Sequence, residues 1–274
     1  MPPARRVAPR RTRSPAGAAA VLLAAAILAS PPGGAACSGR SGGETVPLVE
    51  LYTSEGCNSC PPADRWLSAT FPPGEPRPAA IALAFHVDYW DGLGWKDRFA
   101  TAASGDRQRD AARANRGTFV YTPQVLLQGR EFPEWRSVRA GAALAAIRAR
   151  PALADIAVDA RLQPASIAVE VRARVAQPAR LEGARVGVAL VDSGLVSQVE
   201  AGENAGVRLV HDHVVRSFAT LAVDRDGETH GTLTLARPAE AGRDATIVAF
   251  VQSGRGAAVL QALAVPLEGC ARTP

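Results

Sequence analysis

Two cysteines separated by two residues are the feature of this sequence best suited to chemistry. Cys57 and Cys60 lie in the stretch VELYTSEGCNSCPPADRWL, between a compact apolar run and a segment that begins with two prolines. A pair at this spacing forms a redox-active dithiol, supplies half of a metal site, or closes a small loop as a structural disulfide. The choice depends on the compartment and on the elements that hold the two thiols.

The N-terminus predicts export from the cytoplasm. Residues 1–20 contain five arginines and no acidic residue, and an apolar run and several small residues follow them. This order is typical of a secretory signal peptide, which we place at residues 1–36. Its apolar core is shorter than the roughly 20 residues of a membrane span, although a retained anchor is the alternative. We therefore expect a secreted or periplasmic protein with no membrane span in the mature chain.

Charge gives no reason to expect a nucleic-acid partner. The full chain has 31 basic and 26 acidic residues, and the five surplus arginines all precede residue 37. The mature chain would therefore be neutral, and the high isoelectric point belongs to the signal peptide.

The cysteines must be held by the elements around them, and these predict two domains. After a linker at 37–45, residues 46–152 alternate buried strands with helices, which is typical of a mostly parallel sheet flanked by helices. Residues 153–270 contain seven runs in which apolar and polar residues mostly alternate. That pattern predicts a small antiparallel β-sandwich, and we place the domain boundary near residues 150–154.

Cys57 and Cys60 fall at a predicted junction between a strand and a helix. The free N–H groups and positive dipole end of a helix N-terminus lower the pKa of a nearby thiol. Cys57 would then attack a substrate disulfide, and Cys60 would resolve the mixed disulfide, with no cofactor beyond the dithiol. A metal site would need further ligands, and His86 is the only histidine of the first predicted domain.

Four motifs resemble a known family. VELYTSEGCNSCPPAD, FHVDYWDGLGWKDRF with a following Arg-Gln pair, VYTPQVLLQG and GENAGVRLVHDHVVR are similar, in this order, to the secreted bacterial family called domain of unknown function 1223. The resemblance covers about residues 46–252. It implies an α/β thioredoxin-like domain followed by a small antiparallel β-sandwich-like domain, and it brings no established activity.

The same resemblance assigns a role to YTPQV. Thioredoxin-like proteins place a cis-proline opposite the dithiol, which would make Pro123 the cis residue and expose the backbone of Thr122 to an extended substrate. An ordinary trans proline at a strand start is the alternative. Glu50, in the strand before the dithiol, is similar to the buried acid that thioredoxins use for proton transfer. Its offset from Cys57 differs by one residue, which would turn it to the other face.

The segment FHVDYWDGLGW should end at the same sheet edge as the dithiol. Its polar residues are candidates for tuning the thiols or binding substrate, above all His86, Asp88 and Trp90. The alternative is a structural turn, in which aspartates accept bonds from backbone N–H groups and tryptophans fill the core.

Two features remain in the second half and at the chain ends. The loop from Gly202 to Gly206 is predicted to fold over the dithiol with Asn204, and His211 and His213 are predicted to lie on a half-exposed strand face. Cys37 and Cys270 could form a bridge, or Cys37 could be lipidated, or both could be free thiols.

The leading hypothesis is an extracytoplasmic thiol–disulfide oxidoreductase that acts on a protein or small-molecule disulfide or dithiol. One alternative is a non-catalytic thioredoxin-like binding module with a structural Cys57–Cys60 disulfide. Another is a copper- or zinc-handling protein that uses both cysteines and His86.

Overall fold

β-strands dominate the part of the chain that the computed structural model describes, namely residues 35–75, 78–176, 182–240, 243–254, 258–268 and 270–272. The predicted signal peptide lies outside these residues, except that Ala35 and Ala36 begin the first strand. Within the described ranges no helix is long and apolar enough to cross a membrane.

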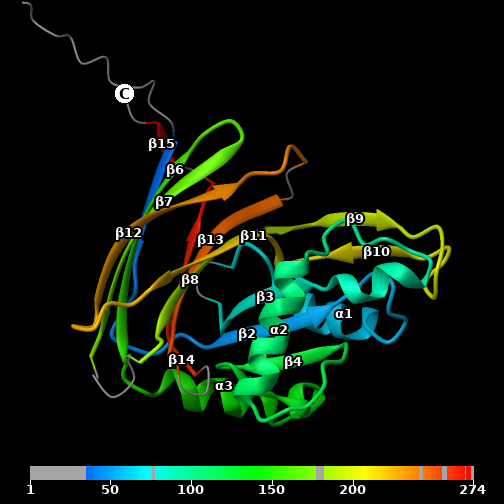
Figure 1. Ribbon diagram of the computed structural model, residues 1–274, viewed down its shortest axis with the longest axis horizontal. Helices are drawn as coiled ribbons and strands as arrows, with labels where there is room; N and C mark the ends of the chain where they lie inside the picture. Colours follow the sequence, from blue (N-terminus) through cyan, green and yellow to red (C-terminus); the bar gives the residue numbers. More distant parts are fainter. Residues whose placement is uncertain are drawn as a thin grey trace, which may run out of the picture. The chain divides into compact units, whose positions relative to one another are not determined.

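The elements follow one another in two groups (Figure 1). The first group is β1 (Ala35–Arg40), β2 (Leu48–Thr53), α1 (Pro61–Thr70), β3 (Ile81–His86), η1 (Asp88–Leu93), α2 (Ala102–Ala114), β4 (Gln124–Leu127), β5 (Arg130–Glu131), η2 (Pro133–Arg136) and α3 (Ala140–Arg148). The second is β6 (Ala154–Leu162), β7 (Ser166–Val175), β8 (Arg185–Ser193), β9 (Leu195–Gln198), β10 (Arg208–His211), β11 (Val214–Ala222), β12 (Glu228–Ala236), β13 (Arg243–Gln252), β14 (Val259–Pro266) and β15 (Ala271–Arg272).

The largest sheet is mixed, so the predicted α/β thioredoxin-like fold with a mostly parallel central sheet is wrong. Its eight strands run in the order β14-β13-β8-β11-β3-β2-β4-β5. Only β2 with β3 and β3 with β11 are parallel pairs in this sheet, and the other pairs are antiparallel.

The physical reason is that four strands of the second half extend the sheet of the first half. β11 pairs with β3 over a short register, with Val214 opposite Ala84, and the N–H of Ala84 donates to the carbonyl of His213. Alternating polarity identifies a strand but does not say which sheet edge it joins. Residues 33–274 form one compact unit, and the predicted boundary near 150–154 falls between α3 and β6.

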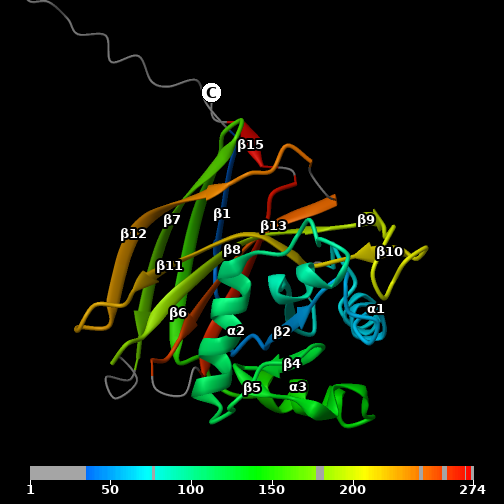
Figure 2. The same ribbon diagram turned by 45° about the vertical axis from the view of Figure 1, so that its right-hand side comes forward.

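A second sheet, antiparallel and five-stranded, has the order β12-β7-β6-β1-β15. Apolar side chains of β6 and β7, such as Val158 and Val169, pack against side chains of β8 and β13, such as Val188 and Ala249. This apolar layer joins the five-stranded sheet to one end of the eight-stranded sheet, and Figure 2 shows β6 and β7 beside β8 there.

At the other end of the eight-stranded sheet, helices cover both faces. Alternation along β2 turns Val49 and Leu51 toward α1 and α3, and Leu48 and Tyr52 toward the face that α2 covers through Ala111. β9 and β10 form a separate two-stranded sheet beside α1, at the right of Figures 1 and 2. The end of β2, the start of α1, the end of β3 and the β9–β10 hairpin therefore lie close together.

Candidate functional site

Cys57 and Cys60 form a disulfide at the junction between β2 and α1, with 5.4 Å between their Cα atoms. Cys60 is the N-cap of α1, and Pro61 occupies the first helical position, where a missing N–H costs nothing. Both cysteine side chains are 0% exposed. The predicted position of the pair between a strand and a helix is confirmed.

The loop between β9 and β10 lies on the cysteine loop, as predicted. The side-chain amide of Asn204 donates to the carbonyls of Glu55 at 2.8 Å and Cys57 at 3.0 Å. The N–H of Asn58 donates to the carboxylate of Glu203 at 3.1 Å. Residues more than 140 positions apart in the chain are thus joined directly beside the bridge.

Trp90 connects the cysteine loop to the proline predicted to be cis. The Thr122–Pro123 peptide bond is cis, and Trp90 Nε1 donates to the hydroxyl of Thr122 at 2.8 Å. The Cβ of Trp90 lies so close to Gly56 that a Cβ there would approach it to 3.3 Å. Trp90 therefore spans the space between the cysteine loop and Thr122.

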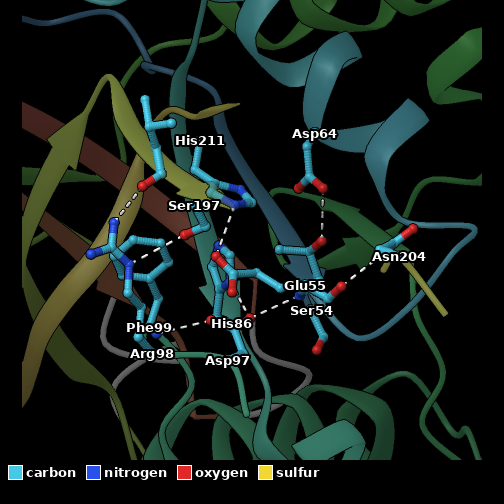
Figure 3. Close-up of polar contacts among 12 residues, drawn as sticks. Ser54, Glu55, Asp64, His86, Asp97, Arg98, Phe99, Ser197, Asn204 and His211 are labelled. Carbon is cyan, nitrogen blue, oxygen red and sulfur yellow. Dashed lines mark hydrogen bonds and ion pairs between the residues drawn. The ribbon is translucent and has the colours of Figure 1, made fainter. Parts of the chain in front are cut away.

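Beneath the cysteine loop, His86 forms a buried ion pair with Asp97 (Figure 3), with 2.6 Å between Nδ1 and Oδ2. Asp97 also accepts bonds from the N–H groups of Glu55 and Phe99, both at 2.9 Å. Burial alone would lower the pKa of His86, but the charge and hydrogen bond of Asp97 outweigh it and raise that pKa. Burial opposes ionisation of Asp97 as well, yet His86 and the two N–H donors lower its pKa.

Glu55 and His211 form a second buried pair, with 3.2 Å between Oε1 and Nε2. Trp95 Nε1 donates to the other carboxylate oxygen of Glu55 at 2.7 Å. Against the opposing effect of burial, the close contact with His211 helps to lower the pKa of Glu55. The ring centroids of His86 and His211 are 5.0 Å apart, so the two pairs form one cluster (Figure 3).

The prediction that His211 lies on a half-exposed strand face is wrong, because its side chain is 2% exposed. His213 does not share its environment: it has a positive φ of 58° after the end of β10, and its Nε2 lies 2.6 Å from the carbonyl oxygen of Phe71. Burial lowers the pKa of His213.

Asp64, in the first turn of α1, adds a carboxylate on the helix side of the cluster. Its Oδ2 accepts a bond from the hydroxyl of Thr53 at 3.2 Å. Burial raises the pKa of Asp64, and the charges of His211 and His86 only partly offset that effect.

Two candidate carboxylates face α2: Glu50, as its one-residue offset from Cys57 predicted, and Asp88, which was predicted near the thiols. Glu50 lies on the same face of β2 as Tyr52 and pairs with Arg107, with 2.7 Å between Oε2 and a terminal guanidinium nitrogen. Asp88 begins η1, and a Cβ on Gly105 of α2 would lie 3.2 Å from its Oδ1. The structure brings His86, Trp90, Thr122 and Pro123 into the region of the dithiol, but directs Glu50 and Asp88 elsewhere.

Sequence reasoning missed Glu55 and Asp97 and misplaced His211. Asp97 lies in the matched motif that contains His86, and Glu55 precedes Cys57 by two residues. Both residues lie close in the sequence to candidate site residues, and this proximity could have indicated that they belong to the site. Among the described residues, no group of three or more His, Cys, Asp or Glu side chains is arranged to hold a metal ion.

The predicted bridge between Cys37 and Cys270 is present, with 5.0 Å between the Cα atoms. Both side chains are partly exposed. The bridge joins the start of β1 to the segment just before β15, and β1 and β15 also pair directly.

Comparison with known proteins identifies a family and a fold. The profile of the family described as "Protein of unknown function (DUF1223)" matches residues 48–252. No curated protein matches the chain significantly.

Two solved structures resemble the chain. The crystal structure of protein AGR_C_4864 from Agrobacterium tumefaciens is 23% identical, with a TM-score of 0.57 over 85% of this chain and 100% of that one. HBP35 of Porphyromonas gingivalis is 14% identical, with a TM-score of 0.61 over 85% of this chain and 78% of that one. At these identities the likeness shows a shared fold alone.

Proposed function

Because the chain belongs to the DUF1223 family of proteins of unknown function, its activity has to be argued from the site, and we propose that it is an extracytoplasmic thiol–disulfide oxidoreductase. The observation that carries this proposal is the Cys57–Cys60 disulfide at the N-terminus of α1, beside a buried cluster of acids and histidines. A disulfide across only two intervening residues adds little to stability by loop closure, because the loop it closes is short.

The proposed reaction is thiol–disulfide exchange. In the reduced protein, the Cys57 thiolate attacks a substrate disulfide, forms a mixed disulfide and releases one substrate thiolate. Cys60 then attacks Cys57, which releases the second substrate thiolate and restores the bridge. The substrate gains the two electrons that the dithiol loses, and the reverse sequence oxidises a substrate dithiol. The dipole of α1 favours the thiolate at its N-terminus.

Substrate would lie along Thr122 and Pro123. Trp90 holds the Thr122 hydroxyl, and the half-exposed rings of Tyr89 and Tyr121 are neighbours of these residues in sequence. An extended polypeptide could pair with the backbone of Thr122 while its apolar side chains contact the rings. His86 would act through Asp97 on the loop that carries Cys57, rather than by touching substrate.

The two disulfides are compatible with an oxidising compartment. Together with the N-terminal sequence, they support a secreted or periplasmic location as part of this proposal. The proposed partner is a protein or small-molecule disulfide or dithiol, and the neutral charge of the predicted mature chain gives no reason to expect a nucleic acid.

One alternative has a specific observation in its favour. Because both cysteines are fully buried, a non-catalytic binding module with a structural Cys57–Cys60 bridge would also have this site. The copper- or zinc-handling alternative would require both cysteines to be reduced, and His86 would have to bind the ion through Nε2, because its Nδ1 is paired with Asp97. Metal analysis of the reduced protein tests it directly.

Trapping of mixed disulfides tests the leading proposal. In a Cys60→Ser variant the resolving thiol is lost, so substrates should remain attached to Cys57 and be released by dithiothreitol. The matched control is Cys57→Ser, which leaves the inner thiol and should capture far less. Equal or absent capture in the two variants would reject the oxidoreductase and favour the module.

A further inference from the structure

Neither cysteine of the Cys57–Cys60 bridge reaches solvent in this structure. Thiol–disulfide exchange requires the attacking sulfur to contact a sulfur of the bridge, so access controls its rate. In the closed conformation described here, that contact is blocked. A neighbouring segment must move before the bridge can react with a thiol from solution.

The segment that holds the cysteine loop from outside is the β9–β10 loop, residues 199–207, which we call the gate loop. It makes three hydrogen bonds to the backbone around Cys57: two from the amide of Asn204 and one to the carboxylate of Glu203. These bonds reach residues 55, 57 and 58, on both sides of the sulfur. Asn204 is itself buried, although its neighbours at 203 and 205 are exposed.

Trp90 also packs on the cysteine loop, at Gly56. Trp90 belongs to η1 and is anchored to Thr122, whereas the gate loop ends a two-stranded sheet outside the two large sheets. The gate loop can therefore shift without breaking hydrogen bonds between strands of either large sheet.

The gate loop is built as a unit. Its own backbone bonds join Gly206 to Val199 and Val207 to Asn204, and Gly202 and Gly206 have positive φ values of 74° and 82°. Gly202 packs so closely on Trp95 that a Cβ there would lie 3.2 Å from the Trp95 Cβ. Polar contacts thus hold a preformed loop over the bridge.

We propose that the gate loop controls access to the Cys57–Cys60 bridge, with Asn204 as the residue that holds it closed. Its biological role rests on the proposed function, since a gate matters only if the bridge reacts. Closed, it shields the bridge from small thiols in solution. A redox partner would have to displace Asn204 and Glu203 from the cysteine loop before exchange begins.

The test is the rate at which dithiothreitol reduces each bridge in the folded, full mature chain. The two thiols of the reagent lose two electrons and two protons, which convert the bridge into two thiols. Alkylation and mass spectrometry then count reduced Cys57 and Cys60 separately from Cys37 and Cys270. The partly exposed Cys37–Cys270 bridge is an internal reference, because the gate loop does not cover it.

The main variant is Asn204→Asp, which keeps the shape of the side chain but places a carboxylate oxygen where the Nδ2 group donated to two carbonyls. Loss of both donated bonds should speed reduction of Cys57–Cys60 by about tenfold or more, with no change at Cys37–Cys270. The matched control is Asn115→Asp. Asn115 also donates to two carbonyls, those of Ala111 and Gly129, and lies at the end of α2. This control should leave the Cys57–Cys60 rate unchanged.

Hydrogen exchange of the amides of residues 199–207 completes the test. An unchanged reduction rate in Asn204→Asp overturns the proposal, whether these amides lose protection or keep it. If the amides lose protection, the loop has opened without exposing the bridge. If they keep protection, Asn204 does not hold the loop closed.

If both bridges react faster in Asn204→Asp, that variant has loosened the whole fold. The reduction rates of the Glu203→Ala variant then decide whether the gate loop controls access. Glu203 is exposed, and its loss removes only the acceptor for Asn58. A smaller rate increase confined to Cys57–Cys60 supports the gate, and no increase overturns it. Reduction by dithiothreitol does not depend on catalytic activity, so it tests the gate separately from the proposed function. If Asn204→Asp speeds reduction but the Cys60→Ser variant captures no substrate, the oxidoreductase is rejected and the gate loop is not.

Discussion

The imidazole of His86 and the carboxylate of Asp97 are paired inside the protein, 2.6 Å apart and almost without solvent contact. The pair joins the end of β3 to the cysteine loop, because Asp97 also accepts the N–H of Glu55. His86 and Asp97 thus position the backbone that leads to Cys57.

This pair makes stability depend on pH. The folded-state pKa of His86 is raised, so its contribution is fully present below the unfolded value of about 6.5 and is lost as pH rises through the folded value. The pKa of Asp97 is lowered, so its contribution is present above about 3.9 and is lost as pH falls through the folded value. Urea unfolding of wild type and His86→Gln should differ most between about pH 4 and 6.5 and less at higher pH. A difference that grows above pH 7 would contradict this assignment.

Breaking the second buried pair should be costly. His211→Gln leaves the carboxylate of Glu55 without its histidine, and leaving a buried polar group without its partner costs about 1–3 kcal/mol. His230→Gln is the matched control, because His230 pairs with Glu170 on the surface and its loss should change stability little. Urea titration of both variants measures the difference. Equal effects would show that the Glu55–His211 pair contributes no more than a surface contact.

The Glu50–Arg107 pair should behave as one unit. The guanidinium of Arg107 lies 4.9–5.2 Å from the ring centroids of Phe85, Phe218 and Phe250, in addition to its contact with Glu50. Arg107→Met leaves a buried carboxylate unpaired and should cost about 3–5 kcal/mol of unfolding free energy. The double variant Glu50→Gln, Arg107→Met should cost less than the two single variants combined, by more than about 0.5 kcal/mol. Additive costs would show that the two side chains act independently.

Removal of the terminal bridge should destabilise the whole protein. Cys37→Ser with Cys270→Ser opens a loop with a sequence separation of 233 residues, and loss of such a disulfide costs about 2–5 kcal/mol. Thermal unfolding should shift down, while the dithiothreitol rate at Cys57–Cys60 in the native state stays the same. A faster rate there would mean that the terminal bridge also restrains the gate loop.

Local patterns predicted the parts of the site that depend on neighbouring residues. The strand-to-helix position of Cys57 and Cys60 follows from an apolar run before them and prolines after them. The cis Pro123 and the contact of Asn204 came from motifs that resemble the family. For these two features the resemblance to the family, rather than the residues around each position, carried the prediction.

What could not be predicted depends on pairing between distant segments. The burial of His211 requires Glu55, more than 150 residues earlier, to lie opposite it. The mixed sheet forms because β11 pairs with the free edge of β3. The alternating sequence of β11 does not indicate which strand edge it pairs with. The face on which Glu50 lies was predicted from its offset along β2, but its partner on α2, Arg107, was not.

The Cys37–Cys270 bridge turns residues 37–270 into a covalent ring. A protease that cuts once at any loop inside this ring leaves the two pieces attached, so the nicked chain can refold in place. Release of a fragment takes two cuts or reduction of the bridge. The Cys57–Cys60 loop inside this ring spans only three residue steps, so opening it leaves the ring closed.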